Sequence, residues 1–325
     1  MSLFAKKSVS MGKIAMFFGR MAAAMVTAGA VAVSAGCARD AAASEAGPAA
    51  GIGSLEGELL EIVNRTPGVM GIALVTDSDT LLINNGVRYP MMSVFKLHQA
   101  IATVKMLEDA GASADTLIAV GASELDPDTW SPDLKPFIGQ PFEISARRLM
   151  DYALISSDNN ASNLLFDHIA DPSTVDSIMH RCAPDTTFRI LWSETQMSLD
   201  HDRAYENYTS PLSAALLIRA LFVSDLLPGR SGDGVREALA AVATGRDRLA
   251  AALEGRDVYF AHKTGSGYRN SRGELAAHND VGYFRLPDGR EYALAVLIRD
   301  FRGTEQEASS LIAEVSGVVL SEFYR

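Results

Sequence analysis

The stretch Tyr89-Pro90-Met91-Met92-Ser93-Val94-Phe95-Lys96-Leu97 decides how the rest of this chain is interpreted. From Ser93 onward, apolar residues recur at helical spacing, which predicts a helix that ends before Gly111. These apolar residues are Val94, Leu97, Ile101, Val104 and Leu107. Pro90 disfavours helix for the residue before it, so the helix should begin within the next few residues. Ser93 and Lys96 then lie one turn apart on the same helical face.

A serine and a lysine in this arrangement can form a nucleophile and its base. A serine hydroxyl reacts well only when a base lies within hydrogen-bond reach, and a lysine amine can serve if its pKa is lowered. Backbone N–H groups at a helix start can also stabilise an oxyanion. The alternative is a capping Ser93 and a solvated Lys96. The same spacing recurs at Ser10 and Lys13, so the pattern alone does not decide.

Size and the N-terminal composition indicate an exported globular protein. The 325 residues are 48% hydrophobic, enough for one large domain or two ordinary ones. Residues 1–36 carry four basic side chains and no acidic one, followed by a short apolar run, and this predicts a signal peptide. The end of this run, Ala35-Gly36-Cys37, resembles a bacterial lipoprotein signal, although Ser34 replaces the usual leucine. Cleavage after Ala35 is the alternative, and both predict a periplasmic protein.

Charge and cysteine content limit the partners. The net charge of −11 becomes about −15 without residues 1–36, which argues against nucleic acid or anionic lipid as a partner. We expect a monomer that binds a small molecule and reaches a membrane only through a lipid on Cys37. The two cysteines, Cys37 and Cys182, predict no disulfide. The six histidines show no paired ligand spacing, so we expect neither a metal nor another cofactor.

The order of predicted elements indicates an α/β (α+β) fold. Residues 37–53 form a flexible tether, and a helix follows over 54–64. Strands are predicted near both ends of the remaining chain, at 69–75, 80–83, 258–262, 280–286 and 292–299. Helices are predicted at 145–154, 160–169, 173–181, 211–222, from a break at 226–234 to about 253, and at 305–323.

Such an order predicts an antiparallel sheet built from both chain ends and flanked by helices, with an inserted all-α lobe. Within a catalytic domain of residues 54–325, the α/β lobe would hold about 54–90 and 235–325, and the all-α lobe about 91–234. A polar connection, 119–141, lies in the second lobe. The cleft between the lobes is the natural place for a site.

Two further motifs carry polar chemistry. Ser157-Asp158-Asn159 lies between two predicted helices, where its residues could cap the second helix or belong to a site. Lys263-Thr264-Gly265-Ser266-Gly267 follows a predicted strand, and its ammonium and hydroxyl groups could bind a carboxylate beside glycines. The alternative for this second motif is a turn with a solvated lysine.

In this order the three motifs resemble those of the class A serine β-lactamases. Ser-Asp-Asn follows Ser-x-x-Lys by about sixty residues, and Lys-Thr-Gly lies about a hundred further on. The resemblance extends over essentially the whole chain after the predicted signal peptide. It implies the serine β-lactamase/penicillin-binding fold and hydrolysis of β-lactam antibiotics, and hence resistance to them, through a serine acyl-enzyme.

The resemblance implies a role for each matching residue. Ser93 would be the acylated nucleophile, and Lys96 its proton-relay partner. Ser157 would pass a proton to the departing lactam nitrogen. The backbone N–H groups of Ser93 and Ser266 would form the oxyanion hole. Whether Lys96 or a glutamate is the base for acylation is left open.

Substrate binding is implied at five positions. Asn159 would hold the side-chain amide of the lactam. Lys263, Thr264 and Ser266 would bind the carboxylate on the fused ring. Trp130 falls where the family often carries an aromatic residue at the cleft rim.

The family also needs a glutamate on a loop between the second and third motifs, to orient the water for deacylation. Glu194 is the best match, with Asn163 matching an asparagine that braces it. The loop departs from the family pattern, because Thr195 replaces a proline, Ser198 an asparagine, and Trp192 an arginine that forms an ion pair. We therefore expect a divergent branch with an altered omega loop. The alternative carboxylates are Asp200, Asp202 and Glu206.

Two other functions are compatible with the same sequence motifs. A penicillin-binding D-alanyl-D-alanine peptidase uses the same serine and lysine but lacks the deacylating glutamate. A non-catalytic, lactam-binding envelope lipoprotein would keep the fold without the chemistry. The intact motifs favour the lactamase over both.

Overall fold

A five-stranded antiparallel sheet is assembled from segments near both ends of the chain, as predicted. The computed structural model describes residues 52–324, so the predicted signal peptide and nearly all of the tether lie outside the described residues. The strand order is β2-β1-β10-β9-β8. The strands are β1 (Val69–Val75), β2 (Thr80–Ile83), β8 (Tyr259–Ser266), β9 (Leu275–Arg285) and β10 (Glu291–Phe301). The central pair joins distant segments, with Val69 opposite Arg299 and Val75 opposite Ala293.

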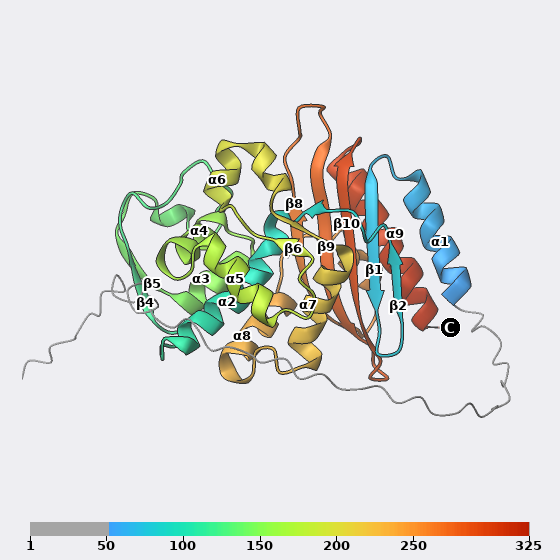
Figure 1. The fold of residues 1–325 in the computed structure, drawn as a ribbon, viewed down its shortest axis with the longest axis horizontal. Helices are drawn as coiled ribbons and strands as arrows, with labels where there is room; N and C mark the ends of the chain where they lie inside the picture. The colour runs from blue at the N-terminus through green and yellow to red at the C-terminus, as the bar shows by residue number, and fades with distance from the viewer. Residues whose placement is uncertain (1–51, 325) are drawn as a thin grey trace, which may run out of the picture. The chain divides into compact units, whose positions relative to one another are not determined.

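Both faces of this sheet are covered. Alternate side chains of β10 divide between two apolar cores, because successive residues of a strand point to opposite faces. Val296 packs with helices α1 (Ile52–Arg65) and α9 (Glu305–Phe323), whereas Ala295 faces the helical part of the chain. Figure 1 shows α1 and α9 on one side of the sheet and the remaining helices on the other. Coverage of both faces explains why β9 is buried along nearly its whole length, including its polar residues His278, Asn279 and Asp280.

The segment between β2 and β8 contains the predicted helices, short strands, and a short helix at Glu194–Leu199 where the sequence predicted a loop. Its α-helices are α2 (Phe95–Asp109), α3 (Ala146–Ile155), α4 (Asn159–His168), α5 (Pro172–Cys182), α6 (Glu194–Leu199), α7 (Pro211–Val223) and α8 (Gly229–Ala240). Its 3₁₀ turns are η2 (Met92–Val94), η3 (Lys135–Phe137), η4 (His201–Tyr205) and η5 (Leu249–Leu253). Two small ladders also occur, β3-β7-β6 and β4-β5. Their strands are β3 (Tyr89–Pro90), β4 (Leu117–Val120), β5 (Phe142–Ser145), β6 (Phe188–Arg189) and β7 (Tyr208–Thr209).

These ladders were not predicted, because strands of two to four residues are too short to show a period. The predicted polar connection 119–141 therefore begins in β4 and ends just before β5.

The glycine-rich break predicted at 226–234 was partly wrong. Helix α8 begins at Gly229, inside this segment, and ends at Ala240, well before the predicted end near Leu253. A Cβ at Gly232 would overlap the backbone oxygen of Leu227, so the glycine allows the first turn of α8 to lie against the preceding segment. The residues just before β8 form the separate 3₁₀ turn η5.

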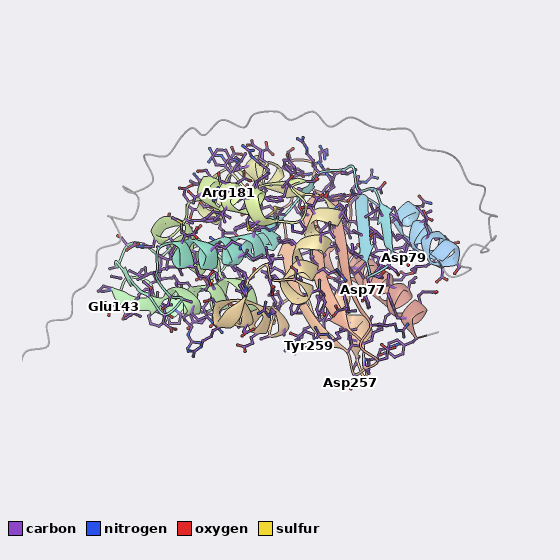
Figure 2. All side chains as sticks on the ribbon, turned by 60° about the horizontal axis from the view of Figure 1, so that its bottom comes forward. Asp77, Asp79, Glu143, Arg181, Asp257 and Tyr259 are labelled. Atoms are coloured by element: carbon purple, nitrogen blue, oxygen red, sulfur yellow. The ribbon has the colours of Figure 1, made fainter. Side chains whose placement is uncertain are left out.

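One end of the sheet carries acidic turns and an apolar cavity. Asp77 and Asp79 lie beside the turn that joins β1 to β2, and Asp257 and Tyr259 lie where β8 begins; Figure 2 labels these residues at that end. A cavity of about 410 Å³ opens there and is lined by residues such as Leu55, Leu74 and Phe323. The Lys-Thr-Gly motif lies toward the other end of β8. Among residues 52–324, no helix is both long and apolar enough to cross a bilayer.

Candidate active site

The nucleophile candidate stands on a strained turn. Met92 has a left-handed backbone with φ of 45°, and Ser93 follows it within the 3₁₀ turn η2, which leads directly into α2. A non-glycine residue in this region costs free energy, so surrounding contacts must hold it. Val94 and Phe95 are buried, whereas Ser93 is partly exposed. The predicted helix is thus a 3₁₀ turn followed by an α-helix, with Lys96 in its first turn.

The Lys96 ammonium is fully buried and surrounded by acceptors. Its Nζ donates to the backbone oxygen of Ser157 at 2.8 Å and to Asn159 Oδ1 at 2.6 Å. It also lies 3.0 Å from Glu194 Oε1. Three such acceptors use the three N–H groups of an ammonium, so the arrangement fits the protonated form. Burial lowers the pKa of Lys96 from its usual value, against the opposing effect of the negative charge of Glu194.

Glu194 meets the serine directly. Ser93 Oγ donates to Glu194 Oε1 at 3.3 Å, and only 4% of Glu194 is exposed. Glu194 is the first residue of α6, which is capped by a reciprocal pair of hydrogen bonds between Ser193 and Gln196. The structure therefore brings Glu194 next to Ser93 and Lys96, which lie about a hundred residues earlier in the chain.

The alternative carboxylates have other partners. Asp200 caps η4 by accepting from the backbone N–H of Asp202. Glu206 Oε2 accepts the indole N–H of Trp192 at 3.0 Å. The described contacts place none of the three beside Ser93.

The loop that carries Glu194, residues 191–207, has its two ends joined by the amide of Asn207 and by contacts of the Trp192 ring. Asn207 Nδ2 donates to the backbone oxygen of Trp192 at 2.8 Å, and its Oδ1 accepts from the N–H groups of Leu191 and Trp192. The Arg203 guanidinium lies 4.5 Å from the centre of the Trp192 ring, whose N–H is held by Glu206. The sequence predicted that an ion pair of the family is lost at Trp192. These contacts connect the loop at that residue.

The Ser157-Asp158-Asn159 segment acts both as a cap and as part of the site. Asp158 is fully buried and caps α4 by accepting from Ala161 N at 2.9 Å. It also accepts from Ser131 Oγ and from two backbone N–H groups, so it fixes the preceding loop against α4. Ser157 has a left-handed backbone with φ of 61°, and its carbonyl oxygen points to Lys96.

The Lys-Thr-Gly motif lies within β8, not after it as predicted, because pairing with β9 continues to Ser266. Lys263 is fully buried, and its Nζ donates to Ser157 Oγ and to the backbone oxygen of Thr264, both at 3.1 Å. Burial, together with the neighbouring positive charge of Lys96, holds the pKa of Lys263 well below its usual value. Ser157 Oγ thus links the two lysines, since Lys96 Nζ lies 3.4 Å from it.

Two site neighbours were missed by sequence reasoning. Arg248 is 6% exposed, and its guanidinium donates to Ser266 Oγ at 2.6 Å and to the backbone oxygen of Asn279 at 2.8 Å. Thr244 Oγ1 lies 2.6 Å from Thr264 Oγ1. Both come from the connection before β8, and neither lies in a recognisable motif.

Asn163 and Ser198 both contact Thr195, the residue after Glu194, but no described hydrogen bond joins either of them to the Glu194 carboxylate. Asn163 Nδ2 donates to Thr195 Oγ1 at 2.8 Å, so the asparagine braces the first turn of α6. The exposed Ser198 donates to the backbone oxygen of Thr195 at 2.8 Å. The hydroxyl of Ser198 is therefore used within α6.

Trp130 is 62% exposed, and its indole N–H donates to the backbone oxygen of Ser156 at 3.0 Å. Its own backbone oxygen accepts from Asn159 N at 2.9 Å, so Trp130 lies next to the second motif.

Within residues 52–324, no group of three His, Cys, Asp or Glu side chains is placed to hold a metal ion.

Comparisons with known proteins show the family. Residues 54–323 match the model of a beta-lactamase enzyme family. The chain is 44% identical to a beta-lactamase of Phocaeicola vulgatus, over 82% of this chain and 84% of the relative. It is 30% identical to the extended-spectrum beta-lactamase PER-1 of Pseudomonas aeruginosa, over 81% and 85% of the two chains.

Solved structures agree as well. A class A beta-lactamase from Bacteroides cellulosilyticus DSM 14838 superposes with a TM-score of 0.78 at 26% identity, over 83% of this chain and 97% of that one. The motifs, the fold and these relatives lead to one conclusion. The chain belongs to the beta-lactamase enzyme family and is a class A enzyme that hydrolyses β-lactams.

Proposed function

We propose that hydrolysis proceeds through an acyl-enzyme on Ser93, with Glu194 as the base. The observation that carries this proposal is the direct contact between Ser93 Oγ and Glu194 Oε1 at 3.3 Å, beside the buried Lys96 ammonium. Because all three N–H groups of Lys96 already have acceptors, the lysine has no lone pair free to accept the serine proton. Glu194 is then the acceptor for this proton, and Lys96 stabilises the carboxylate before the transfer.

In the acylation step, Ser93 Oγ forms a bond to the lactam carbonyl carbon while its proton moves to Glu194. The backbone N–H groups of Ser93 and Ser266 stabilise the oxyanion. The carbon–nitrogen bond then breaks, and the ring nitrogen takes a proton from Ser157 Oγ. Lys263 can replace that proton, since its Nζ lies 3.1 Å from the same oxygen.

Substrate binding follows from the positions of the polar groups. Lys263, Thr264 and Ser266 come from one strand and offer an ammonium and two hydroxyls to the ring carboxylate. Asn159 offers its amide to the lactam side chain, and the exposed Trp130 offers an apolar surface beside it.

Before deacylation, Glu194 passes the proton taken from Ser93 through Lys96 Nζ and Ser157 Oγ, which restores the Glu194 carboxylate and the Lys263 ammonium. In the deacylation step, a water gives a proton to Glu194 and attacks the ester carbonyl, and Glu194 then passes this proton to Ser93 Oγ as the product acid leaves. A D-alanyl-D-alanine peptidase lacks the glutamate that would activate this water for release of a bound lactam. The buried Glu194 beside Ser93 therefore favours a lactamase over a peptidase.

The decisive experiment is turnover of a chromogenic cephalosporin by the purified protein. We expect many turnovers per enzyme, and none by Ser93→Ala, because this variant lacks the nucleophile. A peptidase would instead stall after one equivalent and cleave a D-alanyl-D-alanine peptide. A non-catalytic lipoprotein would show neither activity, and full activity in Ser93→Ala would contradict the mechanism.

We also propose that the enzyme is exported to the periplasm as a monomer after removal of its N-terminal signal segment, which is residues 1–36 for a lipidated Cys37 and residues 1–35 for cleavage after Ala35. The support is the basic, acid-free segment followed by an apolar run. Intact mass of the mature protein distinguishes cleavage after Ala35 from a lipidated Cys37, with Cys37→Ser as the control that cannot be lipidated. A product that retains residues 1–36 would contradict the proposal.

A further inference from the structure

Asn279 is a buried polar side chain that the mechanism above does not use. It lies on β9 with no exposed surface, and its Nδ2 donates to the backbone oxygens of Pro90 at 2.8 Å and Met91 at 3.3 Å. Its Oδ1 accepts from Ile298 N on the neighbouring strand at 3.2 Å. Both ends of the amide are therefore occupied, and they join the centre of the sheet to the segment that precedes the nucleophile.

The peptide groups of Met91 are held from several directions. Its oxygen also accepts from Val94 N at 3.1 Å, and its N–H donates to the backbone oxygen of Asn207 at 2.8 Å. A Cβ at Gly265 would overlap the same Met91 oxygen, so β8 approaches it closely. Asn207 is the residue whose amide joins the two ends of the Glu194 loop. Met91 thus lies between the sheet and the end of the loop that carries Glu194.

This position matters because the next residue is strained. Met92 adopts φ of 45° immediately before Ser93. A left-handed methionine persists only where its neighbours fix the backbone. The flanking Met91 carbonyl is fixed by Asn279, and the side chain of Asn279 reaches it from a strand almost 190 residues later in the chain.

We propose that Asn279 is a positioning residue that holds the strained Met91–Ser93 turn, so that Ser93 Oγ remains 3.3 Å from Glu194 Oε1. The inference rests on the proposed function, because it assigns a role relative to Ser93 and Glu194. Asn279 touches no reacting atom. It acts through the Met91 carbonyl, and Asn207 ties the same residue to the Glu194 loop.

Loss of the amide should act on acylation. Without the Nδ2 donor, the turn can relax toward an unstrained backbone and carry the serine hydroxyl away from its base. A misplacement of about 1 Å can lower a rate by about 10²-fold. Deacylation should change less, because the bound acyl group holds the ester through its own contacts with the strand that carries Lys263.

The test compares Asn279→Ala with Ser309→Ala. Ser309 is equally buried, and its hydroxyl lies 2.9 Å from Nε2 of His278, the residue next to Asn279 on β9. Each variant deletes one buried polar side chain that forms a hydrogen bond between β9 and another element, but only Asn279 contacts the segment before the nucleophile. Rapid mixing with a chromogenic cephalosporin gives the acylation and deacylation rate constants, and thermal unfolding gives Tm.

We expect both variants to have a lower Tm, and only Asn279→Ala to acylate about 10²-fold more slowly. If Asn279→Ala fails to fold, Asn279→Ser, which keeps a hydroxyl, is measured in the same way and should show an intermediate loss. Acylation within threefold of the Ser309→Ala rate would mean that Asn279 is only structural and would overturn the inference. Absence of turnover in the unmodified enzyme would instead contradict the proposed function.

Discussion

Lys96 Nζ lies 3.0 Å from Glu194 Oε1, and both side chains are almost completely buried. A buried ion pair stabilises little in net terms, but removal of one partner leaves the other charge without compensation. The pair therefore makes the site sensitive to any change of either residue. It also places the proposed base and a positive charge on the same side of Ser93.

Glu194→Gln should accumulate acyl-enzyme. The amide keeps the shape of the side chain but can accept a proton from neither Ser93 nor water, so acylation and deacylation should each slow by about 10²–10⁴-fold. The acyl-enzyme that forms during a long incubation should therefore persist. Intact-mass spectrometry after mixing with a penicillin should show one bound acyl group that persists. Glu206→Gln is the control and should release product normally. Rapid release by Glu194→Gln would move the role to a neighbouring carboxylate.

Lys263→Ala should lower kcat/KM for anionic lactams about 10–100-fold, as expected for loss of a charged hydrogen bond. The lowered pKa of Lys263 gives the sign of a second effect. Above this pKa the amine is neutral and no longer attracts a carboxylate, so KM of the unmodified enzyme should rise with pH. In Lys263→Ala, this rise of KM with pH should be absent. Lys135→Ala, on the exposed turn η3, is the control for charge. An unchanged kcat/KM for Lys263→Ala would remove Lys263 from the site.

Trp192→Phe should loosen the Glu194 loop. The substitution deletes the indole N–H that Glu206 accepts but leaves a ring for Arg203 to cover. We expect a stability loss of about 1 kcal/mol and slower deacylation, both measured beside Glu206→Ala, which deletes the same bond from its other end. Glu206→Gln should stay close to the unmodified enzyme, because its amide oxygen can still accept. If Trp192→Phe and Glu206→Ala differ clearly in deacylation, this hydrogen bond is not what holds the loop.

Acid should destabilise the fold through buried histidines. Burial lowers the pKa of His98 from 6.5 to about 3, and burial with the nearby positive charge of Arg248 lowers the pKa of His278 to a similar value. Between pH 6.5 and 3 the unfolded chain therefore binds protons that the folded chain does not. Stability is present above that window and is lost as pH falls through it, by at most about 1.4 kcal/mol per pH unit for each histidine.

His98→Phe tests this pH dependence, because it keeps a ring against Phe188 but removes the titrating group. Urea unfolding between pH 6.5 and 4.5 should give a smaller slope of unfolding free energy against pH for the variant. An equal slope in both proteins would show that His98 does not contribute.

The motif residues and the longer helices and strands could be predicted from the sequence. The strands at 69–75 and 80–83 and the helix at 305–323 were predicted at their observed bounds, because each shows a clear period and lies between turn residues. Ser93, Lys96, Ser157 and Lys263 could be found because the chemistry requires those side chains in characteristic local patterns.

Contacts between distant segments could not be predicted in the same way. Arg248, Thr244 and Asn279 act through partners 18, 20 and nearly 190 residues away, and no local pattern marks them. The extension of β8 through Ser266 was also missed, because glycine in a motif indicates a turn whereas pairing with β9 decides the strand.

The pairing of β1 with β10 has a consequence for biogenesis. Val69 pairs with Arg299, a residue that the ribosome adds about 230 residues later. Until then β1 and β2 form an isolated hairpin, which is at best marginally stable in water. A nascent or truncated chain that stops before β10 would expose unpaired strand edges and aggregate, so a native sheet requires a strand that begins only at Glu291 of the 325 residues.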